Sequence, residues 1–533
     1  MGYKSYKILL IIVLSILLTN CAKRGRPTGG PLDSIPPILV SANPTHETIN
    51  FKAKKIKIYF DEYIKLKNVN KQLVISPPQK TDPVISPLGT ASKLITIEIL
   101  DTLDLNTTYA FNFGNSIVDN NEENELGNFK YVVSTGSYID SLNLMGEVTD
   151  PLLKESVKDV DVMLYEYNDT FTDSTIFKEK PRYIANTLDS TLFDITNLRA
   201  GKYLLIALND ANGNKIYNPE IDKIAFVKDT ITLPTNKTYN FSLFKEIPEL
   251  KVIKPKEITK GHLIFGYKGN AEDVNITLLT KTPTNFKSEF NFEKDKDTIN
   301  YWYTEVDIDS LNFLVSKGNY SEEFTVKIRT SKVDSLTINK STSSILHLKD
   351  TFSLSTNIPI VDFNNSLISI IDQDSSIVNF NTTLSKSKTK LYLDFEKKHN
   401  SKYNFTLLPE TITDVFGVSN DSLSFQLTTK TPEDYGLLNI DLQSDKKTHF
   451  IVELLDSKGD IVRAKKLDKP QIVSFNLLPP GNYSIRAIID ENKNGIWDTG
   501  NFLSKRQPEV VRYFEKDLKV MANWDENEIF ILK

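Results

Sequence analysis

The 533-residue sequence contains one cysteine and five histidines. A single cysteine excludes a disulfide framework and a cysteine-based zinc cluster, because both need several thiols. The histidines are scattered, so the chain carries no His-rich metal motif. Lys and Arg total 64 and Asp and Glu total 69, which gives a net charge of −5. This balance excludes a strongly basic nucleic-acid-binding protein, and we expect no nucleic-acid partner.

Motifs that position catalytic groups are also missing. The sequence has no GxSxG elbow, HExxH helix, GxxxxGK[ST] loop or GxGxxG turn. The adjacent Asp61 and Glu62 lie in a predicted strand, where neighbouring side chains point to opposite faces and do not converge. We therefore expect a protein that is not an enzyme and needs no cofactor. A hydrolase that uses two distant carboxylates stays open as an alternative.

Long hydrophobic runs are absent except at the N-terminus. Lys4 and Lys7 precede the apolar run from Ile8 to Leu18, which is interrupted only by Ser15. The run is shorter than the roughly 20 residues that span a bilayer, and it follows a positive segment. This pattern predicts a signal peptide over residues 1–20.

The end of the apolar run resembles a bacterial lipobox. It reads Leu18-Thr19-Asn20-Cys21, with the leucine three residues before the only cysteine, although Asn20 replaces the usual small residue. The resemblance implies lipidation of Cys21 and anchoring in the outer membrane, on either the periplasmic or the cell-surface side. A chance thiol is the alternative. Stable anchoring takes more than one acyl chain, and lipoproteins of this class carry two or three.

A tether follows at residues 21–35. Residues 25–37 hold four prolines and three glycines, which excludes a helix or a central strand. The segment is either a plain spacer or an extended peptide that docks on a partner.

The remaining sequence alternates between apolar and polar residues. Ile56, Ile58 and Phe60 alternate with polar neighbours, as do Phe324 and Val326. This period of two predicts half-buried strands, and clusters of Gly, Pro, Asn and Asp separate them. We therefore predict an all-β protein, a string of about five β-sandwich domains.

Two internal repeats divide the string. Residues 106–135 correspond to residues 400–431, and residues 193–218 align without gaps to residues 473–498. Residues 36–138 resemble the SbsA-like bacterial Ig-like domain, beginning at Pro36-Pro37. The second repeat resembles the carboxypeptidase regulatory-like, or transthyretin-like, β-sandwich, in which a GxY turn feeds a core strand.

These repeats predict the domain order. The expected ranges are an Ig-like domain at 36–138, a carboxypeptidase regulatory-like sandwich at 140–248, a sandwich of uncertain type at 249–348, a second Ig-like domain at 349–432 and a second regulatory-like sandwich at 433–533.

The best candidate site is the Asx-rich loop at residues 490–498. Oxygen ligands at alternate positions and a glycine at position 6 are typical of a calcium loop, although position 12 is Asn501 and not glutamate. The candidate calcium ligands are Asp490, Asn492, Asn494, the carbonyl of Ile496, and Asp498. The alternative is an Asx turn whose side chains bind their own backbone.

The repeat supplies a weaker copy of this loop. Asp210, Asn212 and Asn214 occupy the corresponding positions, but Gly213 falls at position 4 and Lys215 at position 6. Calcium is again one interpretation. Recurrence of a turn that needs Asx residues is the other.

The whole chain resembles Ig-like-domain lipoproteins of the Bacteroidota type, including the Pro-Thr-Gly-Gly-Pro stretch at 27–31. The resemblance implies a non-catalytic scaffold with a protein partner in the outer membrane, such as an assembly complex like the β-barrel assembly machinery. A glycan-binding or adhesion lipoprotein is the alternative from a different class.

Overall fold

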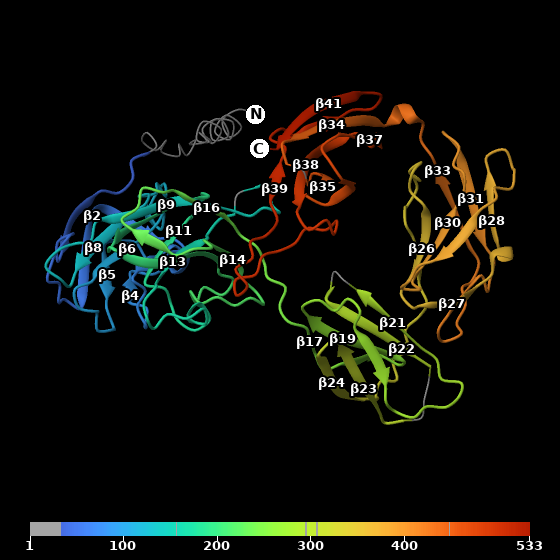
Figure 1. Ribbon diagram of the computed structural model, residues 1–533, viewed down its shortest axis with the longest axis horizontal. Helices are drawn as coiled ribbons and strands as arrows, with labels where there is room; N and C mark the ends of the chain where they lie inside the picture. Colours follow the sequence, from blue (N-terminus) through green and yellow to red (C-terminus); the bar gives the residue numbers. More distant parts are fainter. Residues whose placement is uncertain (1–32, 156, 294–295, 305–307, 447, 533) are drawn as a thin grey trace, which may run out of the picture. The chain divides into compact units, whose positions relative to one another are not determined.

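The computed structural model describes residues 33–155, 157–293, 296–304, 308–446 and 448–532 (Figure 1). The expected signal peptide, Cys21 and most of the tether lie outside these residues. The chain divides into two compact units, Met1–Asp140 and Ser141–Lys533, which are described separately. Strands dominate both units, which confirms the predicted all-β class of β-sandwich modules. None of the helices in the described ranges has the length and apolar character needed to cross a bilayer.

Module 1 forms the first unit. One sheet has the order β1-β2-β5-β4, with β7 also paired to β2, and the other has the order β3-β6-β8. The predicted alternation is present, because Ile56 and Ile58 are fully buried between exposed lysines. Its elements are β1 (Leu39–Asn43), β2 (Lys55–Leu66), α2 (Val69–Gln72), β3 (Val74–Ser76), β4 (Val84–Ser86), β5 (Ser92–Glu98), β6 (Thr108–Asn112), β7 (Ile117–Asp119) and β8 (Lys130–Ser134).

Module 2 opens the second unit. Its two sheets have the orders β11-β10-β13-β14, with β15 on β13, and β12-β9-β16, and the last strand runs parallel to the first. Its elements are β9 (Leu142–Thr149), β10 (Asp161–Glu166), η1 (Thr175–Phe177), β11 (Tyr183–Asn186), β12 (Leu192–Leu198), β13 (Gly201–Asn209), β14 (Lys223–Phe226), β15 (Ile231–Leu233) and β16 (Tyr239–Ser242).

Module 3 packs the sheet β17-β19-β22-β21, with β18 on β19, against β20-β23-β24. Its core includes Phe265 and Phe313, both fully buried, and each such ring contributes about 1.5–3 kcal/mol through burial. Its elements are β17 (Lys251–Val252), β18 (Lys256–Thr259), β19 (His262–Lys268), β20 (Asn275–Leu278), β21 (Ser288–Glu293), β22 (Thr298–Tyr303), β23 (Ser310–Lys317) and β24 (Tyr320–Lys327).

Module 4 contains the sheets β25-β26-β30-β29, β27-β32 and β28-β31-β33. Its elements are β25 (Ile338–Lys340), β26 (Phe352–Thr356), β27 (Ile360–Phe363), η3 (Asn365–Leu367), β28 (Ile368–Asp372), β29 (Asn381–Leu384), β30 (Lys390–Asp394), β31 (Lys402–Leu407), β32 (Ile412–Asp414) and β33 (Leu423–Thr428).

The first strand of module 4 corrects one expected boundary. β25 pairs with β26, and Leu346 belongs to the module 4 core. β25 and Leu346 both lie within the range 249–348, which was expected to form the preceding domain. The module therefore begins at or before residue 338. A strand of three residues is too short to show a period-2 pattern, which explains the error.

Module 5 repeats the architecture of module 2. It has the sheets β36-β35-β38-β39, with β40 on β38, and β37-β34-β41, again with a parallel pairing of first and last strands. Its elements, after η4 (Pro432–Asp434), are β34 (Gly436–Ser444), β35 (His449–Leu455), β36 (Ile461–Leu467), β37 (Ile472–Leu478), β38 (Gly481–Asp490), β39 (Val511–Tyr513), β40 (Leu518–Val520) and β41 (Asp525–Leu532).

The GxY turns of modules 2 and 5 have the same geometry. The Tyr203 hydroxyl donates to the carbonyl of Arg199 at 3.0 Å, and the Tyr483 hydroxyl donates to the carbonyl of Pro479 at 2.8 Å. Both rings are buried among the core residues of their module. The hydroxyl thus ties the turn to the core, which explains why both copies keep tyrosine in the third position of GxY.

Candidate functional site

The loop at residues 490–498, here called the second Asx loop, follows β38. Asp490 is 3% exposed, and its two carboxylate oxygens accept the amide hydrogens of Asn494 at 3.1 Å and Gly495 at 2.8 Å. The side-chain amides of Asn492 and Asn494 donate to one oxygen of Asp498, at 2.6 and 2.7 Å. The loop therefore gathers the predicted ligand side chains, and their oxygens accept hydrogen bonds from the loop itself.

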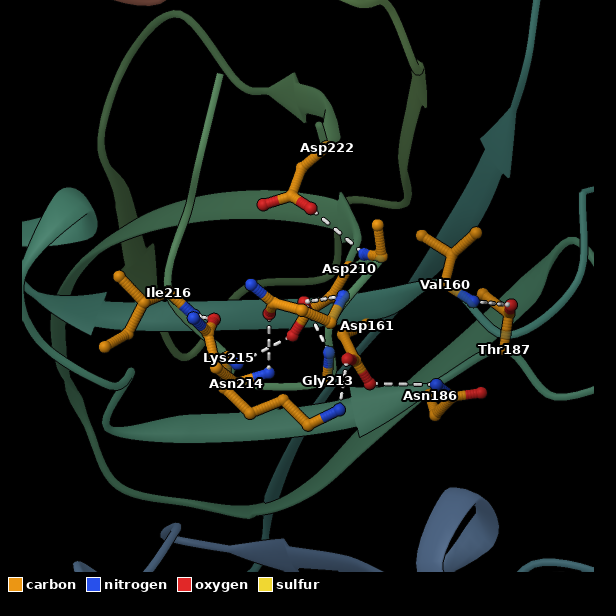
Figure 2. A network of polar contacts seen from close by, with 12 residues as sticks. Val160, Asp161, Asn186, Thr187, Asp210, Gly213, Asn214, Lys215, Ile216 and Asp222 are labelled. Carbon is orange, nitrogen blue, oxygen red and sulfur yellow. Dashed lines mark hydrogen bonds and ion pairs between the residues drawn. The ribbon is translucent and has the colours of Figure 1, made fainter. Parts of the chain in front are cut away.

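Residues 210–218, the first Asx loop, show the same pattern (Figure 2). Asp210 accepts the amides of Asn212, Gly213 and Lys215, at 3.2, 2.8 and 2.6 Å. The side-chain oxygen of Asn214 accepts the amide of Ile216 at 2.8 Å. These are Asx-turn hydrogen bonds, so both loops use their first aspartate to hold the backbone.

The glycine lies at position 4 of the first loop and at position 6 of the second loop, and the backbone conformation explains this difference. Gly213 and Lys215 both have positive φ, at 73° and 65°. In the second loop the corresponding positions are Lys493 and Gly495, with φ of 66° and 75°. Each loop needs two left-handed residues, and each sequence fills one position with glycine and the other with lysine. The two loops therefore follow one path despite the exchanged residues.

An ion pair between a buried aspartate and a partly exposed lysine lies beside the first Asx loop (Figure 2). Lys215 Nζ lies 2.5 Å from Asp161 Oδ2, and the Asn186 side-chain amide donates to Asp161 Oδ1 at 2.8 Å. Asp161 is 2% exposed, and its burial raises the pKa of the carboxyl above the ordinary value of 3.8, against the opposing effect of Lys215. The lysine and the asparagine supply the partners that a buried carboxylate requires.

The second loop has a different lysine in this region. A Cβ atom on Gly495 would meet Nζ of Lys466, which comes from β36. Because this is the end of a flexible side chain, it could move aside. The positive φ, and not a lack of space, therefore favours glycine at position 495.

Sequence reasoning missed one residue of each site. Glu509 accepts the amides of Glu491 and Asp498, at 2.9 and 3.1 Å. Asp222 accepts the corresponding amides of Ala211 and Asn218, at 3.0 and 2.8 Å. Burial raises the pKa of both carboxyls. Each carboxylate closes its loop from a distant segment.

These contacts favour the Asx-turn interpretation of both loops. Within the described ranges, no group of three or more His, Cys, Asp or Glu side chains is arranged to hold a metal ion. Calcium binding by Asp490, Asn492, Asn494, Ile496 and Asp498, or by the first loop, stays an untested alternative.

We expect Asp490→Ala to lower the free energy of unfolding by about 1–3 kcal/mol, because two loop amides lose their acceptor. Asn492→Ala, at an exposed position, should have a smaller effect. We also expect millimolar Ca²⁺ to leave the Tm of the full chain unchanged, as measured by calorimetry. A rise in Tm that Asp490→Ala abolishes would establish the calcium alternative.

Comparison with known proteins identifies one module. Residues 33–135 match the family described as bacterial Ig-like domain. No curated protein sequence matches the chain.

Solved structures that match the chain include the TIE protein of Bacillus anthracis, at 12% identity over 95% of this chain and 76% of that chain, with a TM-score of 0.14. An I-band fragment of titin has 12% identity over 53% and 99%, with a TM-score of 0.12. The major pilin subunit BcpA of Bacillus cereus has 10% identity over 73% and 98%, with a TM-score of 0.14. At these TM-scores the similarities carry no argument about this chain. The match to residues 33–135 and the sheets of the other modules make the chain a multi-domain β-sandwich protein that contains a bacterial Ig-like domain.

Proposed function

We propose that this chain is a non-catalytic lipoprotein of the outer membrane that acts as a scaffold and binds a protein partner. The observation that carries the proposal is the lipobox-like sequence ending at Cys21, followed by a chain of β-sandwich modules. The Asx loops support the non-catalytic part of the proposal, because their carboxylates stabilise turns by accepting hydrogen bonds from backbone amides. The partner belongs to an outer-membrane assembly complex such as the β-barrel assembly machinery.

The lipid anchor is tested by Cys21→Ser in the native host. We expect the wild-type protein to be recovered in the membrane fraction and to carry the mass of two or three acyl chains on Cys21, because a single chain anchors only marginally. The variant should appear in the soluble fraction. Ser15→Ala, within the apolar run, is the matched control and should behave as the wild type. A free thiol on Cys21 by intact-mass analysis would contradict the anchor.

The partner is tested by affinity purification of the lipidated protein in mild detergent, followed by mass spectrometry. We expect a stoichiometric outer-membrane protein that is retained through the wash. Cys21→Ser protein, purified in parallel, separates binding through the modules from co-purification through the lipid. Purification without any stoichiometric protein, combined with binding on a glycan array, would replace this proposal with the adhesion alternative.

A further inference from the structure

Modules 2 and 5 contact each other within the second unit. The outward face of the sheet β35-β38-β39 packs against Leu152 of module 2. The carbonyl of Leu152 accepts two hydrogen bonds from module 5, from Arg486 Nη1 at 2.9 Å and from the Tyr513 hydroxyl at 2.8 Å. The apolar residues of module 5 in this cluster are Ile451, Ile488 and Val511, each less than 9% exposed.

The repeat shows that module 5 contains an insertion at this contact. In module 2, Ile206 on β13 pairs with Phe226 on β14, 20 residues later. In module 5, the corresponding Arg486 on β38 pairs with Tyr513 on β39, 27 residues later. Residues 210–218 and 490–498 align without gaps, so the seven additional residues fall after residue 498. We call Thr499–Gln507 the tongue.

The tongue forms polar contacts with module 2 along its length. The Thr499 hydroxyl donates to the carbonyl of Lys245 at 2.7 Å. The Gln507 side-chain amide donates to the carbonyl of Phe226 at 2.9 Å. Lys505 Nζ lies 2.8 Å from the carboxylate of Asp173.

Phe502 is the apolar anchor of the tongue. It is fully buried, and its ring centroid lies 5.3 Å from that of Phe226 in an edge-to-face arrangement. The amide of Phe502 donates to the carboxylate of Glu246, which is itself 7% exposed. A buried aromatic ring surrounded by satisfied polar groups is typical of the centre of a binding interface. The next residue, Leu503, is 60% exposed.

Besides the insertion, module 5 has two charged residues, on β35 and β38, where module 2 has apolar ones. Module 2 has Met163 opposite Ile206, and both are fully buried. The corresponding pair in module 5 is Glu453 and Arg486, whose side chains form an ion pair at 2.6 Å. The guanidinium that replaces Ile206 is the group that reaches Leu152. The two copies of the repeat thus differ at the residues through which module 5 contacts module 2.

We propose that module 5 is an intramolecular binding module whose ligand is module 2. The tongue and Arg486 recognise the first copy of the repeat, so the two copies stay bound while modules 3 and 4 connect them. Covalent connection raises the effective concentration of one copy near the other, which favours this contact over one between separate chains. This inference does not depend on the lipid anchor or on an outer-membrane partner.

A zero-length carbodiimide crosslinker tests the contact in the full chain. The reagent activates a carboxylate, which an adjacent lysine amine attacks to form an amide. We expect crosslinked peptides that join Lys505 to Asp173 and Lys154 to Asp517, because both ion pairs connect module 2 to module 5. The crosslink between Lys516 and Glu528 reports that module 5 itself is folded.

The decisive variant is Phe502→Asp, which places a charge in the apolar contact. We expect loss of both intermodule crosslinks and retention of the crosslink between Lys516 and Glu528. Leu503→Asp, which places the same charge on the neighbouring exposed residue, is the matched control and should retain all three. Intermodule crosslinks that persist in Phe502→Asp would overturn the role of the tongue.

Two further outcomes overturn the proposal. One is the absence of both intermodule crosslinks from wild-type protein that still forms the crosslink between Lys516 and Glu528. The other is a set of crosslinks that joins ¹⁴N and ¹⁵N peptides in a mixture of labelled chains, because this result would assign the contact to a second copy of the chain. Neither readout involves Cys21 or a membrane partner, so failure here is separate from failure of the proposed function.

Discussion

Arg486→Ile should lower the free energy of unfolding of module 5 by about 3–5 kcal/mol, because Glu453 would be left buried without its cation. Both side chains are close to 10% exposed, so water compensates little of the loss. Equilibrium unfolding in urea, followed by a probe in module 5, measures the change. A loss below 1 kcal/mol would show that the ion pair contributes little in this setting.

A double variant separates the effect of the unpaired Glu453 charge from the effect of the lost contact between Arg486 and Leu152. Adding Glu453→Met to Arg486→Ile recreates the Met163 and Ile206 pair of module 2, which packs fully buried at the corresponding position. We expect this double variant to recover most of the stability, because two apolar side chains replace two charges without leaving either unpaired. Measured together with Glu453→Met alone, these two variants give the coupling energy. Equal losses in both would mean that the contact with Leu152, and not the buried charge, dominates.

Lys215→Met is expected to destabilise module 2 by about 3–5 kcal/mol near neutral pH, since Asp161 would lose the cation that offsets its burial. Lys158→Met is the matched control in the same module. Lys158 lies 3.2 Å from Asp189, but both side chains are more than 60% exposed. Exposed pairs of this kind contribute about 0–1 kcal/mol. Thermal unfolding of the two variants should therefore differ clearly.

The effect of Lys215→Met should also depend on pH. The pKa of the Asp161 carboxyl is already raised by burial, and removal of Lys215 raises it further. A carboxyl with a raised folded pKa binds its proton more tightly when folded, so the stability that it contributes is present at acid pH. This stability is lost as pH rises from the ordinary value of 3.8 through the folded pKa. The difference between variant and wild type should thus be small below pH 3.8 and largest at neutral pH. A difference that does not change with pH would exclude Asp161 as its source.

The sequence predicts the strands and the repeated turns well, because both depend on local pattern. Ile56 and Ile58 are buried as their alternation indicates, and the GxY tyrosines occupy equivalent places in modules 2 and 5. The Asx loops were also predictable as loops, since aspartate and asparagine bind nearby backbone amides. The prediction of an Ig-like domain at residues 36–138 is supported by the family match over residues 33–135.

The remaining features depend on contacts between segments far apart in the sequence. Asp222 and Glu509 play the same part in their loops, but the seven-residue insertion removes them from a gapless alignment. In the sequence Lys215 is only a residue at position 6 of the loop, whereas its side chain pairs with Asp161 on another strand. Neither relation leaves a periodic signal. Comparison of the two copies on both sides of the insertion would have identified the carboxylates.

The parallel pairing of β9 with β16 has a mechanical consequence. The chain enters module 2 at the start of β9 and leaves it at the end of β16, and in a parallel pair these points lie at opposite ends of the strands. Tension applied along the chain therefore pulls the two strands past each other. Under this shear, the hydrogen bonds between Gly146–Thr149 and Tyr239–Ser242 bear the load together and do not open one after another. Module 2 should accordingly resist stretching more strongly than a hairpin of the same length pulled from its open end.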